Sequence, residues 1–109
     1  MASKTYDYVL TEIAEADVDE AFDYIANELA NPDAASAFAD ELEEKLEEIC
    51  KIPKAGRPVH NPYLKRQDIR RVLVKNYIAY YLIDETQGCI VVLRVVYNRC
   101  DHDKILKTI

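Results

Sequence analysis

Residues 69–97 read IRRVLVKNYIAYYLIDETQGCIVVLRVVY, three runs of β-branched and aromatic residues separated by two short polar segments. Runs of this composition are typical of strands. The polar segments, 75–76 and 85–88, fit tight turns because Asn76 and Gly88 accept positive φ angles. The third run is apolar on both faces, which indicates a central strand covered by helices. We therefore predict a three-stranded meander over residues 69–74, 77–84 and 89–97.

Two amphipathic helices are predicted upstream of this meander. Thr11 caps the first helix, over residues 12–29, while Asn31 and Pro32 begin the second, over residues 32–51. Because the connection between them is only about three residues long, the helices form an antiparallel hairpin. The helical residues expected in the core lie at three- and four-residue spacings. They are Ile13, Val18, Phe22, Ile25, Phe38, Leu42, Leu46 and Ile49, and they face Val72, Val74, Val92 or Leu93 of the sheet.

The remaining segments complete one α+β domain over residues 1–109. Residues 5–10 form a short first strand whose place in the sheet the sequence leaves open. Residues 52–68 hold three of the four prolines and form a long basic loop without regular structure. The order is therefore β-α-α-β-β-β, with the helical hairpin packed on one face of a small, mainly antiparallel sheet. The second face is expected to carry no helical cover, and Ile105 and Leu106 anchor a last turn.

Composition and cysteine spacing exclude several classes of protein. The chain has 109 residues, of which 50% are hydrophobic, as in an ordinary globular domain. No apolar run approaches the roughly 18 residues of a membrane span, and the polar start lacks a signal-peptide stretch. We therefore expect a cytoplasmic protein with no membrane partner. The three cysteines and two histidines lack metal-ligand spacing, so neither a metal site nor a cofactor is expected.

Charge is divided between the two halves of the chain. Residues 1–50 contain fifteen acidic and two basic side chains, a net charge of −13, whereas residues 51–109 contain twelve basic and five acidic ones, a net charge of +7. This asymmetry indicates one acidic and one basic face. The basic half could attract nucleic acid or an acidic protein surface, or the two halves could attract each other within the fold. The overall charge of −6 argues against non-specific RNA binding.

The sequence carries a series of short motifs whose order and spacing resemble one family of proteins. They are Ala21-Phe22-Asp23-Tyr24-Ile25-Ala26, Ala37-Phe38, Leu42, Ile52-Pro53, Gly56-Arg57-Pro58, Arg71-Val72-Leu73-Val74, Tyr77-Ile78-Ala79-Tyr80-Tyr81 and Leu93-Arg94-Val95-Val96-Tyr97-Asn98-Arg99-Cys100-Asp101. Together they cover nearly the whole chain. They resemble the RelE/ParE toxins of type II toxin–antitoxin modules, which act in plasmid stabilisation and growth inhibition in bacteria.

This resemblance implies one of two activities. RelE-like members cleave mRNA in the ribosome, ParE-like members inhibit DNA gyrase by binding it, and both are neutralised by a cognate antitoxin. The RelE-like nucleases use an Arg in a strand where this chain has Ile78, an Arg matched here by Arg99, and a Tyr or His where this chain has Ile105. Because only one of the three positions matches, the sequence favours a ParE-like gyrase inhibitor that is not an enzyme. The alternatives are a ribosome-dependent endoribonuclease and a degenerate member without toxicity.

The residues expected at the functional surface follow from this interpretation. Under the endoribonuclease alternative, the catalytic residues are Arg99 and His102, although His102 could equally be a solvated histidine of the tail. Arg99 could bind an anion in a bidentate manner or form a surface pair with Asp101. The residues expected to bind a partner are Arg57, Lys65, Arg66, Arg71, Tyr97 and Arg99. Tyr77, Tyr80 and Tyr81 could stack on bases, but aromatic residues on strands are more often buried.

Overall fold

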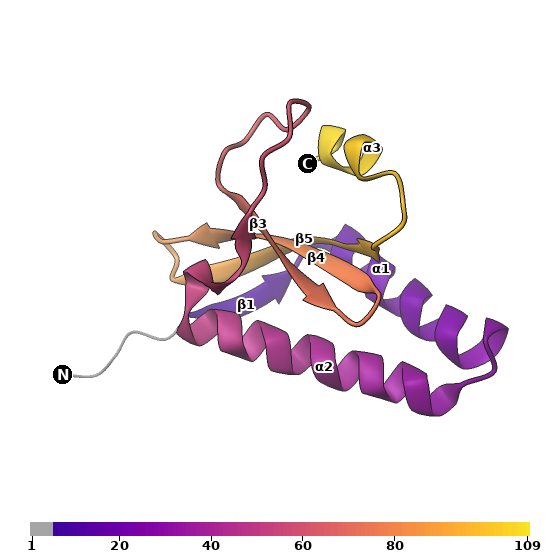
Figure 1. Ribbon diagram of the computed structural model, residues 1–109. Coiled ribbons are helices and arrows are strands. Elements are labelled where there is room, and N and C mark those ends of the chain that lie inside the picture. Colours follow the sequence, from indigo (N-terminus) through magenta and orange to yellow (C-terminus); the bar gives the residue numbers. More distant parts are fainter. Residues whose placement is uncertain (1–5) are drawn as a thin grey trace.

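The computed structural model describes residues 6–109, and its centre is a mixed five-stranded sheet (Figure 1). The meander is confirmed as β3 (Ile69–Val74), β4 (Tyr77–Asp84) and β5 (Cys89–Tyr97), paired antiparallel. The first strand, β1 (Asp7–Leu10), pairs in parallel with β5 and so lies at one edge of the sheet. The expected start of this strand, Thr5, lies outside the described residues. The strand order is β1-β5-β4-β3-β2.

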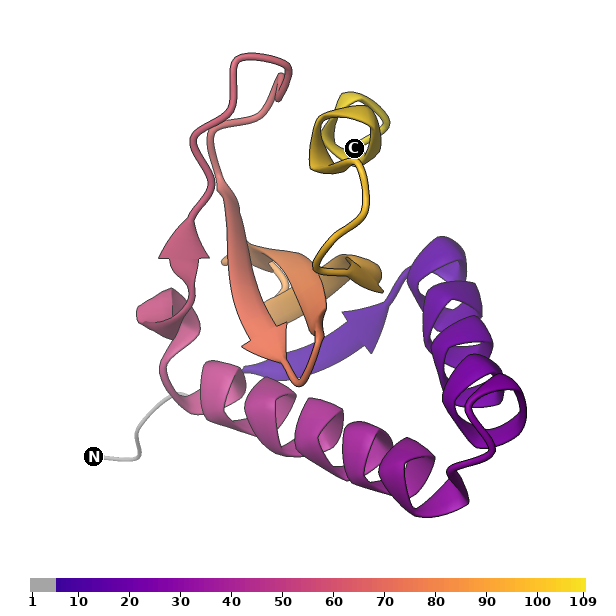
Figure 2. The ribbon, with the colours of Figure 1, turned by 45° about the vertical axis from the view of Figure 1, so that its right-hand side comes forward.

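The helical hairpin is also confirmed, as Figure 2 shows. Helix α1 (Glu12–Asp23) begins at Thr11, whose hydroxyl accepts a hydrogen bond from the backbone N–H of Ala14. Helix α2 (Pro32–Lys51) begins at Asn31, whose side chain accepts from the N–H of Ala34. Both caps satisfy backbone donors that the first helical turn leaves without partners. The two helices pack on one face of the sheet.

The first helix differs from the expected continuous α-helix over residues 12–29. It changes into a π-helical turn, η1 (Tyr24–Glu28), before the connection to α2. Ala30 then takes a positive φ of 48°, which reverses the chain. A π-helical turn widens the helix locally and is frequent at functional sites. It leaves Tyr24 and Leu29 about half exposed at the tip of the hairpin.

The core differs from the expected one along α1. Ala14 and Ala21 are buried there, whereas Ile13 and Phe22 are 59% and 38% exposed. The expected α2 residues Phe38, Leu42, Leu46 and Ile49 are buried as predicted, and Val74 and Val92 of the sheet pack against them. Leu93 belongs to the other face of the sheet. Small residues on α1 let that helix approach β5 closely, which turns its larger apolar side chains outward.

The turns between the strands are nearly those expected. Gly88 has a φ of 63°, as predicted for the turn before β5. In the turn between β3 and β4 the positive φ belongs to Lys75, at 55°, and not to Asn76. The backbone N–H of Lys75 donates to the carboxylate of Glu41 on α2, and its ammonium lies 3.5 Å from the same carboxylate. These contacts hold the turn in its strained conformation and lower the pKa of Glu41.

The segment between α2 and β3 contains regular structure that the sequence analysis did not predict. A short 3₁₀ turn, η2 (Pro53–Ala55), leads into a two-residue strand, β2 (Arg57–Pro58), which pairs with β3 and forms the second edge of the sheet. Residues 59–68 then leave the sheet as a loop.

The second face of the sheet is partly covered, contrary to expectation. Helix α3 (His102–Lys107) and the loop after β2 both lie over it (Figure 1). Leu106 of α3 and the loop residues Val59 and Leu64 join Ile69, Tyr80, Leu82 and Val96 in a second apolar cluster. Asn61 also donates a hydrogen bond to Asp103 of α3.

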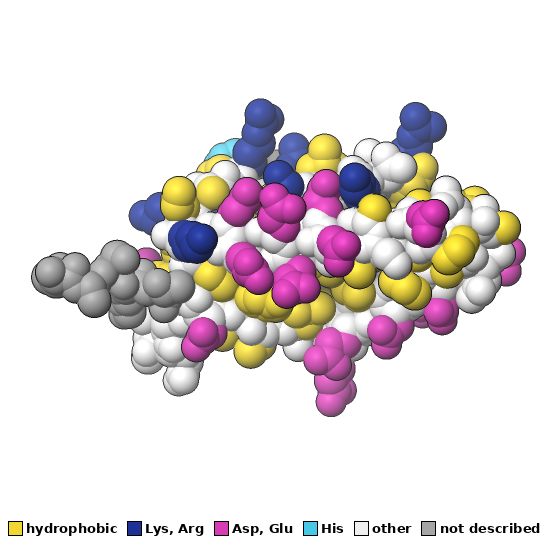
Figure 3. All heavy atoms as spheres, turned by 90° about the horizontal axis from the view of Figure 1, so that it is seen from below, with side chains coloured by type: hydrophobic (Ala, Val, Ile, Leu, Met, Phe, Trp, Pro, Cys, Tyr) yellow, Lys and Arg dark blue, Asp and Glu magenta, His cyan; other side chains and the backbone are white. Residues whose placement is uncertain are grey.

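Acidic side chains predominate on the face that α2 presents. Acidic side chains gather over the helical face in Figure 3, and the visible lysine and arginine side chains lie mostly at its margin. The exposed acidic residues of α2 are Asp33, Asp40, Glu43, Glu44, Glu47 and Glu48. Within residues 6–109, no helix combines the length and hydrophobicity needed to cross a membrane.

Candidate partner-binding site

His102 lies at the start of α3 and is held against the sheet. Its Nε2 atom lies 2.7 Å from the backbone oxygen of Asn98, and its Nδ1 atom lies 2.7 Å from the Tyr80 hydroxyl. Because a carbonyl oxygen only accepts, the neutral ring carries its hydrogen on Nε2 and accepts from Tyr80 at Nδ1. Both ring nitrogens are therefore engaged within the chain. His102 is thus a fixed link between α3 and β4, unlike a solvated histidine of the tail.

Tyr80 is buried beneath this histidine at 1% exposure. Burial raises the pKa of the Tyr80 hydroxyl, and the neighbouring Arg71 guanidinium opposes that rise. Arg71 reaches Tyr80 because the two residues are direct partners between β3 and β4. The structure therefore brings Arg71 and His102 to the same tyrosine.

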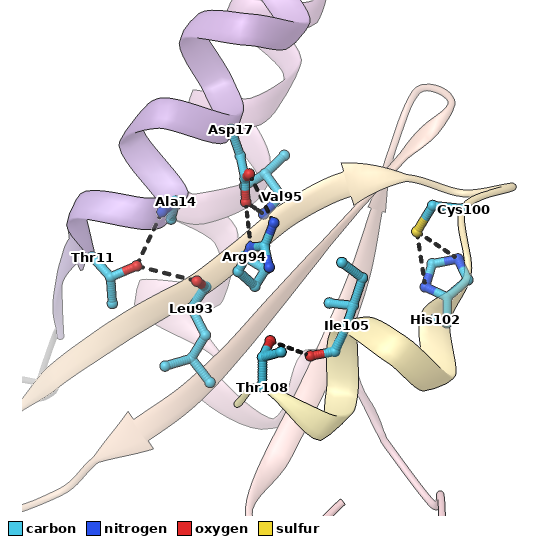
Figure 4. Close-up of polar contacts among 10 residues, drawn as sticks. All are labelled: Thr11, Ala14, Asp17, Leu93, Arg94, Val95, Cys100, His102, Ile105 and Thr108. Carbon is cyan, nitrogen blue, oxygen red and sulfur yellow. Dashed lines mark hydrogen bonds and ion pairs between the residues drawn. The ribbon is translucent and has the colours of Figure 1, made fainter. Parts of the chain in front are cut away.

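Arg99 is exposed in the turn after β5, and the hydrogen bonds that join Tyr80 and His102 do not include it. The alternative surface pair with Asp101 is not present within residues 6–109, because the Asp101 carboxylate caps α3 by accepting from the N–H of Lys104. The neighbouring Cys100 Sγ lies 3.8 Å and 3.9 Å from the two ring nitrogens of His102 (Figure 4). Burial raises the pKa of this thiol, which disfavours the reactive thiolate.

Replacement of His102 by alanine is expected to lower the free energy of unfolding by about 1–2 kcal/mol, because two hydrogen bonds to α3 are lost. Amide hydrogen exchange within α3 should accelerate more than exchange in β4. Lys104→Ala, an exposed change on the same helix, serves as the control. Unchanged exchange in α3 of the His102 variant would contradict the fixed link.

Beside the cluster of His102 and Tyr80, the candidate site contains a pair of arginines, Arg57 and Arg71. They are direct partners between β2 and β3, so their side chains share one face of the sheet, and both residues are exposed. Like charges directly opposite each other on neighbouring strands repel. Beside them is a hollow of about 490 Å³ lined by Ala55, Gly56, Arg57, Arg71, Val72, Leu73 and Ile78. An anionic group at this place would relieve the repulsion.

Most of the other guanidinium groups are occupied by internal partners. Arg66 donates two hydrogen bonds to Asp68, which lowers the pKa of that carboxyl. Arg94 donates two to Asp17, and Arg70 donates to the backbone oxygens of Gly56 and Lys54. Of the expected partner-binding residues, Arg66 is therefore engaged within its own loop. Lys65 is exposed beside it.

The wall of the hollow is fixed by Tyr81, which lies on the opposite face of β4 from Tyr80. The Tyr81 hydroxyl accepts from the backbone N–H of Gly56 and donates to the backbone oxygen of Pro53. Tyr81 is fully buried, and burial raises the pKa of its hydroxyl. These bonds hold η2 and the start of β2 against the sheet, and so place Arg57 opposite Arg71.

Tyr97 is the remaining expected partner-binding residue, and it lies away from the arginine pair. It is 45% exposed and packs edge-on against Tyr77, which in turn contacts Phe38. The three side chains line a groove of about 760 Å³ at the tip of the hairpin, together with Tyr24, Ile25, Leu29, Ala34, Ala37, Lys75 and Asn76. No local pattern in the sequence indicates the exposure of Tyr24 and Leu29, because it arises at the π-helical turn.

The structure thus separates the predicted residues into three places: the arginine pair, the loop with Lys65 and Arg66, and the end of β5 with Tyr97 and Arg99. Among the described residues, no group of three or more His, Cys, Asp or Glu side chains could hold a metal ion. The geometry is that of a small α+β protein with an exposed arginine pair and a groove lined by aromatic side chains.

Comparison with known proteins identifies the family. The sequence pattern described as "ParE toxin of type II toxin-antitoxin system, parDE" matches residues 8–101. The chain therefore belongs to the ParE toxin family. No curated protein matches the sequence.

Solved structures share the fold at low sequence identity. A chain of the chromosomal ParDE toxin–antitoxin system from P. aeruginosa has a TM-score of 0.68 and 21% identity, with 87% of this chain and 98% of that one covered. A chain of the RelBE2 toxin–antitoxin complex from Mycobacterium tuberculosis has a TM-score of 0.60 and 19% identity, with 85% and 98% covered. The isolated RelE toxin of E. coli has a TM-score of 0.55 and 16% identity, with 94% and 97% covered.

Proposed function

We propose that this ParE-family toxin arrests bacterial growth by binding a protein target in the cytoplasm, DNA gyrase, and that a cognate antitoxin neutralises it. The observation that carries the proposal is the geometry around His102. RNA cleavage needs a base, an acid and a phosphate-stabilising cation around one phosphate. Both ring nitrogens of His102 are engaged within the chain. Ile78 and Ile105 stand where the RelE-like nucleases carry an Arg and a Tyr or His. Protein binding requires none of these groups and needs no cofactor.

The proposed antitoxin site is the groove at the tip of the hairpin, defined above by Tyr97 and its neighbours. The structures with the same fold include toxin–antitoxin systems from P. aeruginosa and Mycobacterium tuberculosis, which supports such a partner. An apolar groove beside an acidic helical face suits a segment that carries apolar anchors and basic side chains. Tyr24 and Leu29, which are about half exposed, would lose the most apolar surface to the bound segment.

The proposed target-binding surface is the basic part of the sheet. Arg57 and Arg71 form its centre because their charges lack carboxylate partners within residues 6–109. Lys65 and Arg99 are exposed at separate places, where they would make further contacts with the target. Arg66 contributes less, since its guanidinium would have to leave Asp68.

A second candidate function, mRNA cleavage on the ribosome, is favoured by one observation. Arg71, Tyr80 and His102 lie together, and a cation beside two proton-carrying groups could act on a phosphate. This candidate requires α3 to move, because His102 Nδ1 must release the Tyr80 hydroxyl before it can accept a proton.

Expression of the chain in a bacterial host separates these functions. We expect growth arrest with intact mRNA and loss of negative plasmid supercoiling, and a weaker arrest for Arg99→Ala. Arrest with cleaved, translated mRNA would replace the proposal by the nuclease function. Absence of arrest at an expression level confirmed by immunoblot would indicate a degenerate member that keeps the fold.

A further inference from the structure

Beside the arginine pair, the edge of β3 has backbone groups that no neighbouring strand covers. Strand β2 covers only Arg70 and Arg71 of β3, while β3 continues to Val74. The two-residue turn at 75–76 makes Val74 and Tyr77 a hydrogen-bonded pair. Along an antiparallel ladder such pairs alternate with non-hydrogen-bonded pairs, so Leu73 and Ile78 form a non-hydrogen-bonded pair. The backbone N–H and C=O of Leu73 therefore point away from β4. Within residues 6–109 they have no hydrogen-bond partner.

The side chains along this edge are of two kinds. Arg57 and Arg71 are charged and exposed, while Leu73, two positions beyond Arg71, is 56% exposed. Leu73 is the direct partner of Ile78, so these four side chains share the face that contains Tyr80. A bare edge with an exposed leucine is a template for strand addition.

We propose that this edge binds an extended acidic segment of the target protein, which adds to the sheet beside Leu73 and places a carboxylate between Arg57 and Arg71. The inference rests on the proposed function only in taking the target to be a protein. Carboxylates suit guanidinium groups because they accept two parallel hydrogen bonds. An apolar residue two positions along an added strand would lie on the same face and cover Leu73 and Ile78.

A nucleic acid fits this surface less well. The hollow beside the arginines is lined by Val72, Leu73 and Ile78, and the nearest tyrosine on that face, Tyr80, is buried and has no ring face to stack on a base. Single-stranded binding without stacking relies on phosphate contacts alone, and the net charge of −6 opposes it.

The test uses the full chain and a synthetic peptide of alternating glutamate and valine, about eight residues long, followed by amide chemical shifts. We expect the Leu73 amide to shift. We expect the double variant Arg57→Gln/Arg71→Gln to weaken binding about tenfold or more. Lys104→Gln removes an exposed charge on α3 and should change the affinity for the peptide little. A peptide N-methylated on the amides that face the edge should also bind at least tenfold more weakly, and this control leaves the protein unchanged.

Three outcomes would overturn the inference. The first is peptide binding that shifts residues other than the β3 edge, or no shift at about millimolar peptide. The second is a single-stranded RNA of similar length that binds more tightly than the peptide and loses affinity in the double variant. The third is a folded double variant that still arrests growth in the absence of antitoxin. Failure of the gyrase proposal would be seen separately, as unchanged plasmid supercoiling in arrested wild-type cells.

Discussion

Replacement of Asp17 by alanine is expected to lower the free energy of unfolding by about 3 kcal/mol. The Asp17 carboxylate accepts two hydrogen bonds from Arg94 and a third from the backbone N–H of Val95 (Figure 4). The side chains of Arg94 and Asp17 are only 20% and 12% exposed, so removal of the carboxylate leaves a poorly hydrated guanidinium and an unpaired N–H. The midpoint of thermal unfolding should fall by roughly 10–20 °C.

Asp19→Ala provides the matched control, because Asp19 is exposed two residues further along the same helix. Its unfolding free energy should stay within about 0.5 kcal/mol of the wild type. Equal stabilities of the two variants in urea would show that the Asp17 contacts contribute nothing. The contacts matter for the fold because β5 extends beyond β1, and Asp17 occupies a backbone donor on that uncovered edge.

Replacement of Gly56 by alanine is expected to cost about 3 kcal/mol and to displace Arg57. A Cβ atom at this position would lie 2.3 Å from the Tyr81 hydroxyl oxygen and 2.8 Å from the backbone oxygen of Arg71. Tyr81 is fully buried and cannot move aside, so the backbone before β2 must shift. Growth arrest should weaken together with stability, because the spacing between Arg57 and Arg71 changes.

Ala55→Ser is the control for this effect, since Ala55 is the exposed neighbour of Gly56. Its free energy of unfolding should match that of the wild type. A Gly56→Ala variant that unfolds at the wild-type urea concentration would mean that β2 is not packed as described. A second variant, Tyr81→Phe, should lose about 1–3 kcal/mol because it leaves the Gly56 N–H and the Pro53 oxygen without their partner.

Local sequence patterns were sufficient to predict most of the fold. The runs that form β3, β4 and β5 are bounded by polar turns, and the caps at Thr11 and Asn31 are side-chain contacts within three residues. These signals lie entirely within short windows of the chain. The helical hairpin followed from the short connection before α2, although the two helices meet at a wide angle (Figure 2).

The differences arise from contacts between distant residues. Strand β2 exists because Tyr81, 25 residues along the chain, binds Gly56, and no local pattern in residues 52–58 shows this. The outward direction of Ile13 and Phe22 results from the close approach of Ala14 and Ala21 to the sheet. The π-helical turn interrupts the α-helix that periodicity predicted to continue to residue 29.

In the candidate site too, residue types could be predicted locally, whereas their contacts depend on distant parts of the chain. Arg57 and Arg71 were expected at a binding surface from their charge, but their direct pairing depends on the register of β2 against β3. His102 was considered as an acid or base from its residue type alone. Its engagement with Tyr80 and Asn98 depends on where α3 docks, which the sequence of a polar tail does not indicate.

The proposal that the chain inhibits a protein target is tested most directly with purified DNA gyrase and relaxed plasmid. We predict that the purified chain inhibits supercoiling, that Arg57→Gln/Arg71→Gln weakens the inhibition about tenfold or more, and that His102→Ala retains it. In a parallel translation reaction mRNA should remain intact. Full gyrase activity with the chain in excess, together with mRNA cleavage that His102→Ala abolishes, would contradict the proposal.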